Sequence, residues 1–312
     1  MLVLWILLAL LFAALLLFGV LFYVGICRWP NRALADAIPP GVSGKWEQRV
    51  RDGVAWMRQQ DTERICIRSY DGLKLAALFL PAAETQPKGT IILVHGWRSS
   101  GYNDFSCAYQ YYHGLGYNIL NIFQRAHGES QGCFTCFGVK ERYDCQSWAR
   151  YVAERFGPEH DIFFSGISMG AASVMMATGL ELPANVRGIL ADSGFTSPWE
   201  QFAHVLPRRF HLPVHPTIEI ADLLCRCIAG FGFRECSSID ALAGNKIPML
   251  FVHGLADTFV PPEMSRRNYE ACAAPKELVL VEGARHGLSY LVDEPRVSGE
   301  IKNFLRKWGT FS

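Results

Sequence analysis

The sequence predicts an α/β protein in which helices cover both faces of a mostly parallel β-sheet. Three observations support this fold class. Short β-branched runs alternate with longer helical patterns. Half of the residues are hydrophobic and 19% are charged, which excludes a disordered chain. After its apolar start, the chain of 312 residues is still long enough for one large catalytic domain.

The N-terminal residues 1–26 contain no charged side chain and match the length of a spanning helix, so we expect a single-pass membrane anchor. A cleaved signal peptide is the alternative, but no Lys or Arg precedes the run and its apolar core is too long. Basic residues gather on its C-terminal side, which predicts a cytoplasmic catalytic domain. They are Arg28, Arg32, Lys45, Arg49 and Arg51.

Residues 27–60 are expected to form a connector with a helix over Gly44–Gln59, and residues 61–312 the catalytic domain. The turn signal Tyr70-Asp71-Gly72 predicts that the sheet opens with an antiparallel hairpin and continues parallel. Eight strands are expected, at Glu63–Ser69, Leu73–Leu80, Thr90–His95, Asn118–Phe123, Asp161–Ser165, Val186–Ala191, Pro248–His253 and Glu277–Glu282. Helices are expected at Asp104–Gly114, Val139–Phe156, Met169–Leu180, Pro262–Ala273 and Asp293–Trp308.

One insertion interrupts this alternation. Residues 196–245 contain two helical patterns, near Pro198–Leu206 and Pro216–Ala229, where the rest of the sequence predicts a single crossover connection. A segment of this length at one edge of a sheet is expected to form a small helical lid.

A G-x-S-x-G pattern places Ser168 on a sharp turn between an apolar strand and a helix, the position of a serine nucleophile. The same spacing occurs around Ser130, but no helix pattern follows it. The flanking strand and helix therefore favour Ser168.

A serine hydroxyl needs an imidazole to accept its proton and a carboxylate to orient that imidazole. Asp257 and His286 each follow a late strand, so they should reach the sheet edge at which Ser168 emerges. Asp192 is the rival acid because it also follows a strand. His127 and His253 are the rival bases, although both are expected to shape loops.

The negative charge of a tetrahedral intermediate needs backbone N–H donors. One normally comes from the residue after the nucleophile and one from the loop after the third strand, which here are Met169 and Trp97. Both are predicted to form the oxyanion hole, and Trp97 also to line the acyl pocket.

These residues together resemble the α/β-hydrolase superfamily across about Glu63–Trp308. The loops 125–130 and 257–262 are further similar to those of membrane-anchored bacterial hydrolases of the Bem46-like and serine-aminopeptidase-like branch. Phe123 departs from that pattern, because many relatives carry Asp there. Superfamily members with an aspartate nucleophile act on epoxides or haloalkanes, and Ser168 argues against those activities.

The resemblance implies a serine hydrolase that cleaves small-molecule carboxylic esters. The expected anchor, together with a segment at Phe195–Phe233 rich in Phe, Leu and Pro, favours apolar or amphipathic esters near a membrane as substrates. A peptidase or amidase with the same triad is the alternative. A noncatalytic membrane-anchored scaffold is a third possibility.

No cofactor, metal or nucleic-acid partner is expected. Thirty basic against 29 acidic residues give a net charge of +1, which offers no general attraction to nucleic acid. The pairs Cys133/Cys136 and Cys225/Cys227 lack the spacing of a structural zinc site, and no phosphate-binding glycine motif is present. The sequence leaves the oligomeric state open.

Overall fold

The computed structural model describes residues 1–28, 42–99 and 101–310, without the side chains at positions 10, 11, 14 and 45. Its centre is an eight-stranded sheet in the order β1-β2-β4-β3-β5-β6-β7-β8. The strands are β1 (Glu63–Arg68), β2 (Lys74–Leu80), β3 (Thr90–Val94), β4 (Asn118–Phe123), β5 (Ile162–Ile167), β6 (Val186–Asp192), β7 (Met249–Gly254) and β8 (Lys276–Val281).

Strand β2 pairs antiparallel with both of its neighbours, β1 and β4, and the pairs among β3 to β8 are parallel. The predicted eight strands, the opening hairpin and the parallel continuation are thus confirmed. Every residue of β3 and β4 is buried, as expected for strands that are covered on both faces. The parallel strands end at one edge of the sheet.

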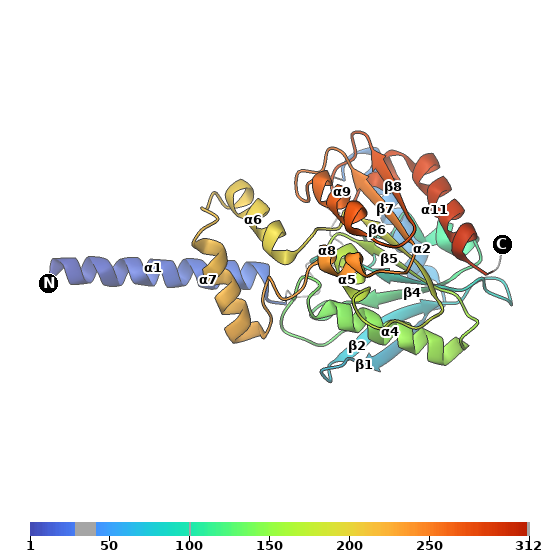
Figure 1. The fold of residues 1–312 in the computed structure, drawn as a ribbon, viewed down its shortest axis with the longest axis horizontal. Coiled ribbons are helices and arrows are strands. Elements are labelled where there is room, and N and C mark those ends of the chain that lie inside the picture. Colours follow the sequence, from blue (N-terminus) through green and yellow to red (C-terminus); the bar gives the residue numbers. More distant parts are fainter. Residues whose placement is uncertain (29–41, 100, 311–312) are drawn as a thin grey trace.

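Helices cover both faces of the sheet (Figure 1). One face carries α4 (Glu141–Phe156), α5 (Met169–Ala177) and α9 (Pro262–Ala271), whose apolar side chains join one core cluster. The other face carries α2 (Lys45–Gln59), α3 (Tyr109–Gly114) and α11 (Glu294–Trp308), with the short α10 (Ser289–Val292) beside them.

The insertion between β6 and β7 is helical. It contains α6 (Pro198–Arg209), α7 (Thr217–Leu224), a π-helix at Cys225–Ala229 and α8 (Ser238–Ala243). Helix α6 begins where predicted because Ser197 accepts a hydrogen bond from the Glu200 N–H and Pro198 fits the first turn. A third core cluster joins side chains of the insertion, among them Phe231 and Phe233, to residues of the rest of the domain.

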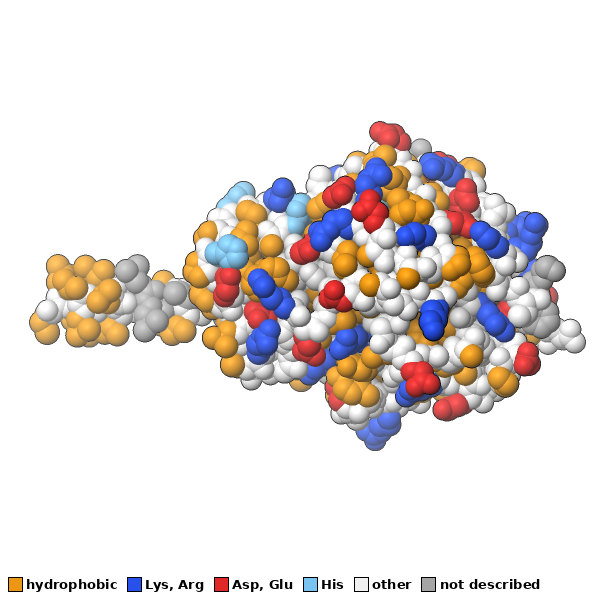
Figure 2. All heavy atoms as spheres, in the orientation of Figure 1, with side chains coloured by type: hydrophobic (Ala, Val, Ile, Leu, Met, Phe, Trp, Pro, Cys, Tyr) orange, Lys and Arg blue, Asp and Glu red, His pale blue; other side chains and the backbone are white. Residues whose placement is uncertain are grey.

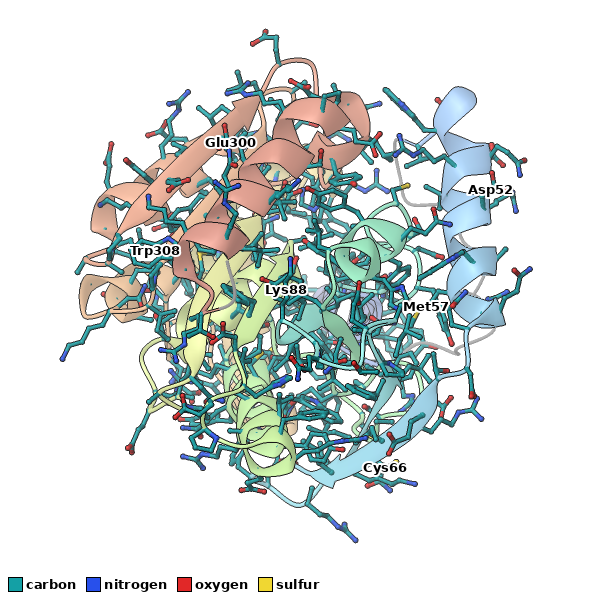
Figure 3. All side chains as sticks on the ribbon, turned by 90° about the vertical axis from the view of Figure 1, so that its right-hand side faces the viewer. Asp52, Met57, Cys66, Lys88, Glu300 and Trp308 are labelled. Atoms are coloured by element: carbon teal, nitrogen blue, oxygen red, sulfur yellow. The ribbon has the colours of Figure 1, made fainter. Side chains whose placement is uncertain are left out.

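Helix α2 is packed against the domain, within the segment that the sequence predicts to be a connector. Its Met57 side chain turns inward and is buried, while Asp52 faces solvent (Figure 3). A side chain at Gly53 would lie 1.9 Å from the carbonyl oxygen of Ser106, so this glycine is what lets α2 approach so closely. The helix therefore forms part of the wall of the domain.

Helix α1 (Leu2–Gly25) takes up the apolar N-terminal stretch and projects from the domain, with α7 beside its C-terminal half (Figure 1). Over the described residues, no helix reaches the length and apolar character that crossing a bilayer requires, so the expected transmembrane helix at residues 1–26 is not confirmed. Of the basic residues that follow it, Arg32 lies outside the described residues.

The C-terminal end of α1 is attached to the domain. Ile26 is buried in the third core cluster, and its carbonyl accepts a hydrogen bond from the Thr135 N–H. Cys27 forms an antiparallel bridge with Phe134, and the Arg28 guanidinium donates to two backbone carbonyls of residues 128 and 130.

Candidate active site

Ser168 lies at the turn between β5 and α5, with φ of 56° and ψ of −116°. The two glycines of its motif are required by packing. A side chain at Gly166 would lie 2.6 Å from the carbonyl oxygen of Gly170, and one at Gly170 would lie 1.9 Å from that of Val94. The turn therefore packs against the end of β3, which positions the Ser168 hydroxyl at the sheet edge.

The structure brings the three predicted residues into one hydrogen-bonded chain. The Ser168 hydroxyl donates to His286 Nε2 at 2.8 Å, and His286 Nδ1 donates to Asp257 Oδ2 at 2.7 Å. A carboxylate can only accept, so the Nδ1 proton is fixed by Asp257 and Nε2 is left as the acceptor for the serine. This is the tautomer that a general base needs.

Asp257 is nearly fully buried, yet its surroundings stabilise the charged carboxylate. Its Oδ1 accepts the backbone N–H groups of Phe259 and Val260, each at 2.9 Å. Burial alone would raise the pKa of Asp257, but the hydrogen bonds from His253 and His286 outweigh it and lower that pKa well below the ordinary value.

The two rival histidines support loops. His253 Nε2 donates to Asp257 Oδ2 at 3.1 Å and to the Val260 carbonyl at 2.9 Å. His127 Nε2 accepts the Arg98 N–H, and burial lowers the pKa of His127 to about 3. Neither ring has a hydrogen bond to Ser168 among the described residues.

The rival acid Asp192 also lies near Ser168, but its backbone and not its side chain makes the contact. Its backbone carbonyl accepts the Ser168 N–H at 2.8 Å, and its carboxyl group accepts the Ser193 hydroxyl. The imidazole of His286 is bonded to Asp257 instead. Burial raises the pKa of Asp192, which favours its neutral form.

The second G-x-S-x-G serine, Ser130, is a structural residue. Its hydroxyl donates to the Phe123 carbonyl at 2.5 Å and accepts the Ala76 N–H at 2.8 Å, so it joins the loop after β4 to β2. Strand and helix context thus separates the two motifs as predicted.

The two predicted oxyanion donors lie on either side of the nucleophile turn. Met169 is the first residue of α5, and Trp97 follows β3 directly after Gly96, where an added Cβ would lie 3.3 Å from Ser168 Cβ. Within the described part of the chain, neither backbone N–H donates to a protein acceptor. The Trp97 indole donates to the Gly25 carbonyl of α1 at 3.0 Å, and the Arg98 guanidinium covers its ring.

Asp104 belongs to the same loop system and no sequence pattern marked it. Its Oδ2 accepts the Gly96 N–H at 2.6 Å. A side chain at Gly96 would contact both this oxygen and Ser168 Cβ. Asp104 therefore fixes the backbone directly before Trp97, through a contact that only the folded chain creates.

A cavity of about 700 Å³ opens at Ser168, within the size range of small-molecule sites. The sheet edge, α2, α3, α6, α10 and α11 all contribute to its wall. Across the residues that the structure describes, no three histidine, cysteine or acidic side chains are grouped as metal ligands.

No family model matches the chain. It is 26% identical over 259 residues to the uncharacterized protein YqkD of Bacillus subtilis, which covers 80% of this chain and 85% of that protein. It is 25% identical over 235 residues to the uncharacterized protein YfhR of Escherichia coli K12, covering 72% and 73%. A third relative is the uncharacterized membrane protein YNL320W of Saccharomyces cerevisiae, 22% identical over 171 residues, with 54% of each chain covered.

Among solved structures, the esterase Pf2001 of Pyrococcus furiosus is similar with a TM-score of 0.65 at 21% identity, covering 88% of this chain and 98% of the esterase. The α/β hydrolase GrgF of Penicillium sp. sh18 is similar with a TM-score of 0.60 at 16% identity, covering 80% and 99%. Likeness at this level of identity establishes the fold, not the reaction. The chain therefore has the α/β-hydrolase fold.

Proposed function

We propose that the protein is a serine hydrolase that cleaves carboxylic esters through an acyl-enzyme intermediate. The observation that carries the proposal is the hydrogen-bonded chain from Ser168 through His286 to Asp257. Its geometry matches the nucleophile, base and orienting acid of acyl transfer. The similarity to solved esterases supports the same class of reaction.

In the first half-reaction, Ser168 Oγ bonds to the ester carbonyl carbon while its proton passes to His286 Nε2. The carbonyl oxygen becomes an oxyanion, which the N–H groups of Trp97 and Met169 would stabilise. The bond to the alcohol oxygen then breaks, and His286 returns the proton to the departing alcohol.

In the second half-reaction, water attacks the acyl-Ser168 ester while His286 accepts a proton from it. The intermediate collapses, His286 protonates Ser168 Oγ, and the carboxylic acid leaves. Asp257 stays charged throughout and stabilises the imidazolium that forms in both halves.

The inner wall of the cavity supports apolar or amphipathic esters as substrates. Val50, Leu288 and Ile301 line it and are buried, so an acyl chain placed there would leave water. Helix α6 supplies residues on the outer side, which supports a lid role for the insertion. The similarity to the Bem46-like and serine-aminopeptidase-like branch stays a prediction.

We further propose that the protein works against a lipid surface. The side chains of Leu4, Phe12 and Leu16 on α1 are more than half exposed, and Leu223 and Ile228 on the neighbouring insertion are also exposed. Figure 2 shows apolar side chains along α1 and on the adjoining surface, an arrangement typical of membrane contact. Sedimentation of the full chain with phosphatidylcholine vesicles tests this, and a protein that stays in the supernatant would refute it.

The decisive experiment compares the two serines that share one motif. Using the full chain in mild detergent, we expect Ser168→Ala to lower kcat for a p-nitrophenyl ester by about 10⁴-fold or more. Ser130→Ala is the matched control, and it should reduce stability while leaving kcat of the folded protein nearly unchanged. Equal activity of wild type and Ser168→Ala would exclude the mechanism. A parallel series of p-nitroanilides separates an amidase from an esterase.

A further inference from the structure

The cavity beside Ser168 has an apolar inner end and a basic outer end. The inner end is formed by buried aliphatic side chains such as Val50, Leu288 and Val297. The outer end is formed by exposed side chains from the last turn of α6 and from the loop before His286. The two ends therefore offer different chemistry to the two halves of an ester.

Three arginines line the outer end: Arg208, Arg209 and Arg285. Within the described ranges none of them forms an ion pair with a carboxylate, and Arg208 donates only to the His204 backbone carbonyl, at 3.3 Å. Several arginines elsewhere on the surface are paired, as Arg155 is with Glu63. Three guanidinium groups at one cavity mouth without a carboxylate partner leave their donors available to an anion.

The acidic side chains that line the same cavity do not cancel this charge. They are Asp104 and Asp192, which lie near Ser168. Asp104 accepts the Gly96 N–H and Asp192 accepts the Ser193 hydroxyl. Within the described residues, neither carboxyl group forms an ion pair with one of the three arginines.

We propose that the natural substrate is an amphipathic ester whose alcohol part carries an anionic oxygen group, a carboxylate or a phosphate, held by Arg208, Arg209 and Arg285. This inference rests on the proposed ester hydrolysis. The acyl chain occupies the inner end, the carbonyl carbon lies at Ser168 Oγ, and the anionic alcohol leaves through the basic mouth. Bidentate guanidinium contacts suit both anions.

A structural role is the competing explanation. Arg208 and Arg209 occupy the last turn of α6, where cations stabilise the helix dipole. In that case their replacement would lower the melting temperature without changing which ester is preferred. Substrate preference, rather than activity alone, is therefore the informative measurement.

The experiment uses two octanoyl esters that differ by one carboxylate, those of 2-nitrophenol and of 3-hydroxy-4-nitrobenzoic acid. We expect the full chain to prefer the anionic ester by about tenfold in kcat/KM at low salt. The preference should shrink between about 20 and about 300 mM NaCl, as charges at the mouth are screened. Octanoylglycerol 3-phosphate against monooctanoylglycerol repeats the comparison for phosphate, and the larger preference identifies the anion.

The triple variant Arg208→Gln, Arg209→Gln, Arg285→Gln should lose the preference, because its kcat/KM for the anionic ester should fall to about that for the neutral ester. Arg150→Gln is the matched control, because Arg150 is exposed, has no ion pair in the described chain and lies away from the cavity. It should keep the full preference.

A wild type with equal kcat/KM for both esters, or a triple variant that keeps the preference, would overturn the inference. Failure of the proposed function looks different, since no Ser168-dependent hydrolysis of the neutral ester would then occur. A triple variant that changes only in melting temperature would also overturn it and would assign Arg208 and Arg209 to the stability of α6.

Discussion

At the residue scale, the hydrogen bonds of Asp257 explain why this carboxylate and not Asp192 is the candidate acid beside His286. Asp257 receives hydrogen bonds from two backbone N–H groups and two imidazoles. Each of these donors favours the charged form. Asp192 has fewer donors and its burial favours the neutral form. The sequence leaves both acids open because both follow strands, and only the contacts of the folded chain distinguish them.

The substitution Asp257→Asn should therefore lower kcat strongly. Loss of the carboxylate removes the acceptor that fixes the Nδ1 proton of His286, and we expect a decrease of about 10³- to 10⁴-fold. Asp192→Asn is the matched control and should change kcat by less than about tenfold, since Asp192 does not bond His286. Steady-state kinetics on one ester checks both variants, and a larger loss in Asp192→Asn would reassign the acid.

A second prediction concerns pH. Burial lowers the pKa of His127 to about 3 and of His95 to about 4, below the value of about 6.5 in an unfolded chain. Between these values the unfolded chain binds protons that the folded chain does not. The free energy of unfolding should therefore fall as pH decreases from about 6.5 toward 4, by up to about 1.4 kcal/mol per pH unit for each histidine.

Urea unfolding at about pH 7 and about pH 5 measures this effect. The variant His127→Gln, whose amide oxygen can still accept the Arg98 N–H, should lose less stability between the two pH values than wild type does. His211→Asn is the control because His211 is exposed, and it should retain the wild-type slope. If the free energy of unfolding of His127→Gln depends on pH as strongly as that of wild type, His127 is not the source of the pH dependence.

At the scale of elements, the sequence predicts the sheet well and the loops poorly. The strand Asn118–Phe123 matches at both ends, because a short apolar run bounded by turn residues has few alternatives. Helix α3 begins at Tyr109 and not at the expected Asp104, since the Asp104 carboxyl group bonds Gly96 instead of starting a helix. Helices α8 and α10 are too short to produce a periodic pattern.

The packing of α2 could not be predicted from the sequence for a similar reason. The close contact between Gly53 and Ser106 joins two segments that no local pattern relates. The same holds for the bond from the Trp97 indole to the Gly25 carbonyl, which spans 72 positions. Residue types that carry chemistry can be recognised from spacing, but contacts across the fold depend on where the elements finally lie.

Two helical glycines test the packing of α2. Gly53→Ala should destabilise the protein by about 1 to 3 kcal/mol, because the new Cβ would overlap the Ser106 carbonyl and push α2 outward. Gly299→Ala in α11 meets no atom within 4 Å and should stabilise by about 0.5 to 1 kcal/mol through helix propensity. Thermal unfolding of both variants measures the difference, and equal melting temperatures would contradict the assigned contact.

At the scale of the whole molecule, residues 25–28 pack against the α/β-hydrolase domain at the end of α1. Ile26 is buried among residues of the insertion, and residues 27 and 28 pair with the loop at 133–135. Gly25 accepts the indole of Trp97. The boundary expected at residue 26 thus falls inside a packed region.

Two truncations test this continuity. A chain that starts at Val20 keeps Gly25 and Ile26, whereas one that starts at Arg28 loses both. We expect the shorter chain to be less stable by about 2 to 5 kcal/mol, as for removal of a buried isoleucine, and to have a lower kcat. Trp97→Phe in the full chain should reproduce the part of the stability loss that is due to the indole hydrogen bond, about 1 kcal/mol. Identical melting and kinetics of the two truncations would refute the assignment.

The hydrogen bond between Gly25 and Trp97 also couples the position of α1 to the candidate oxyanion hole. The last residue of α1, Gly25, accepts the indole N–H of Trp97, and the backbone N–H of Trp97 is one of the two candidate oxyanion donors. If α1 tilts relative to the sheet, the Gly25 carbonyl moves and the hydrogen-bonded Trp97 indole moves with it. A force applied at the N-terminus would therefore displace a candidate oxyanion donor. The turnover of a tethered molecule would then depend on the angle at which α1 is held.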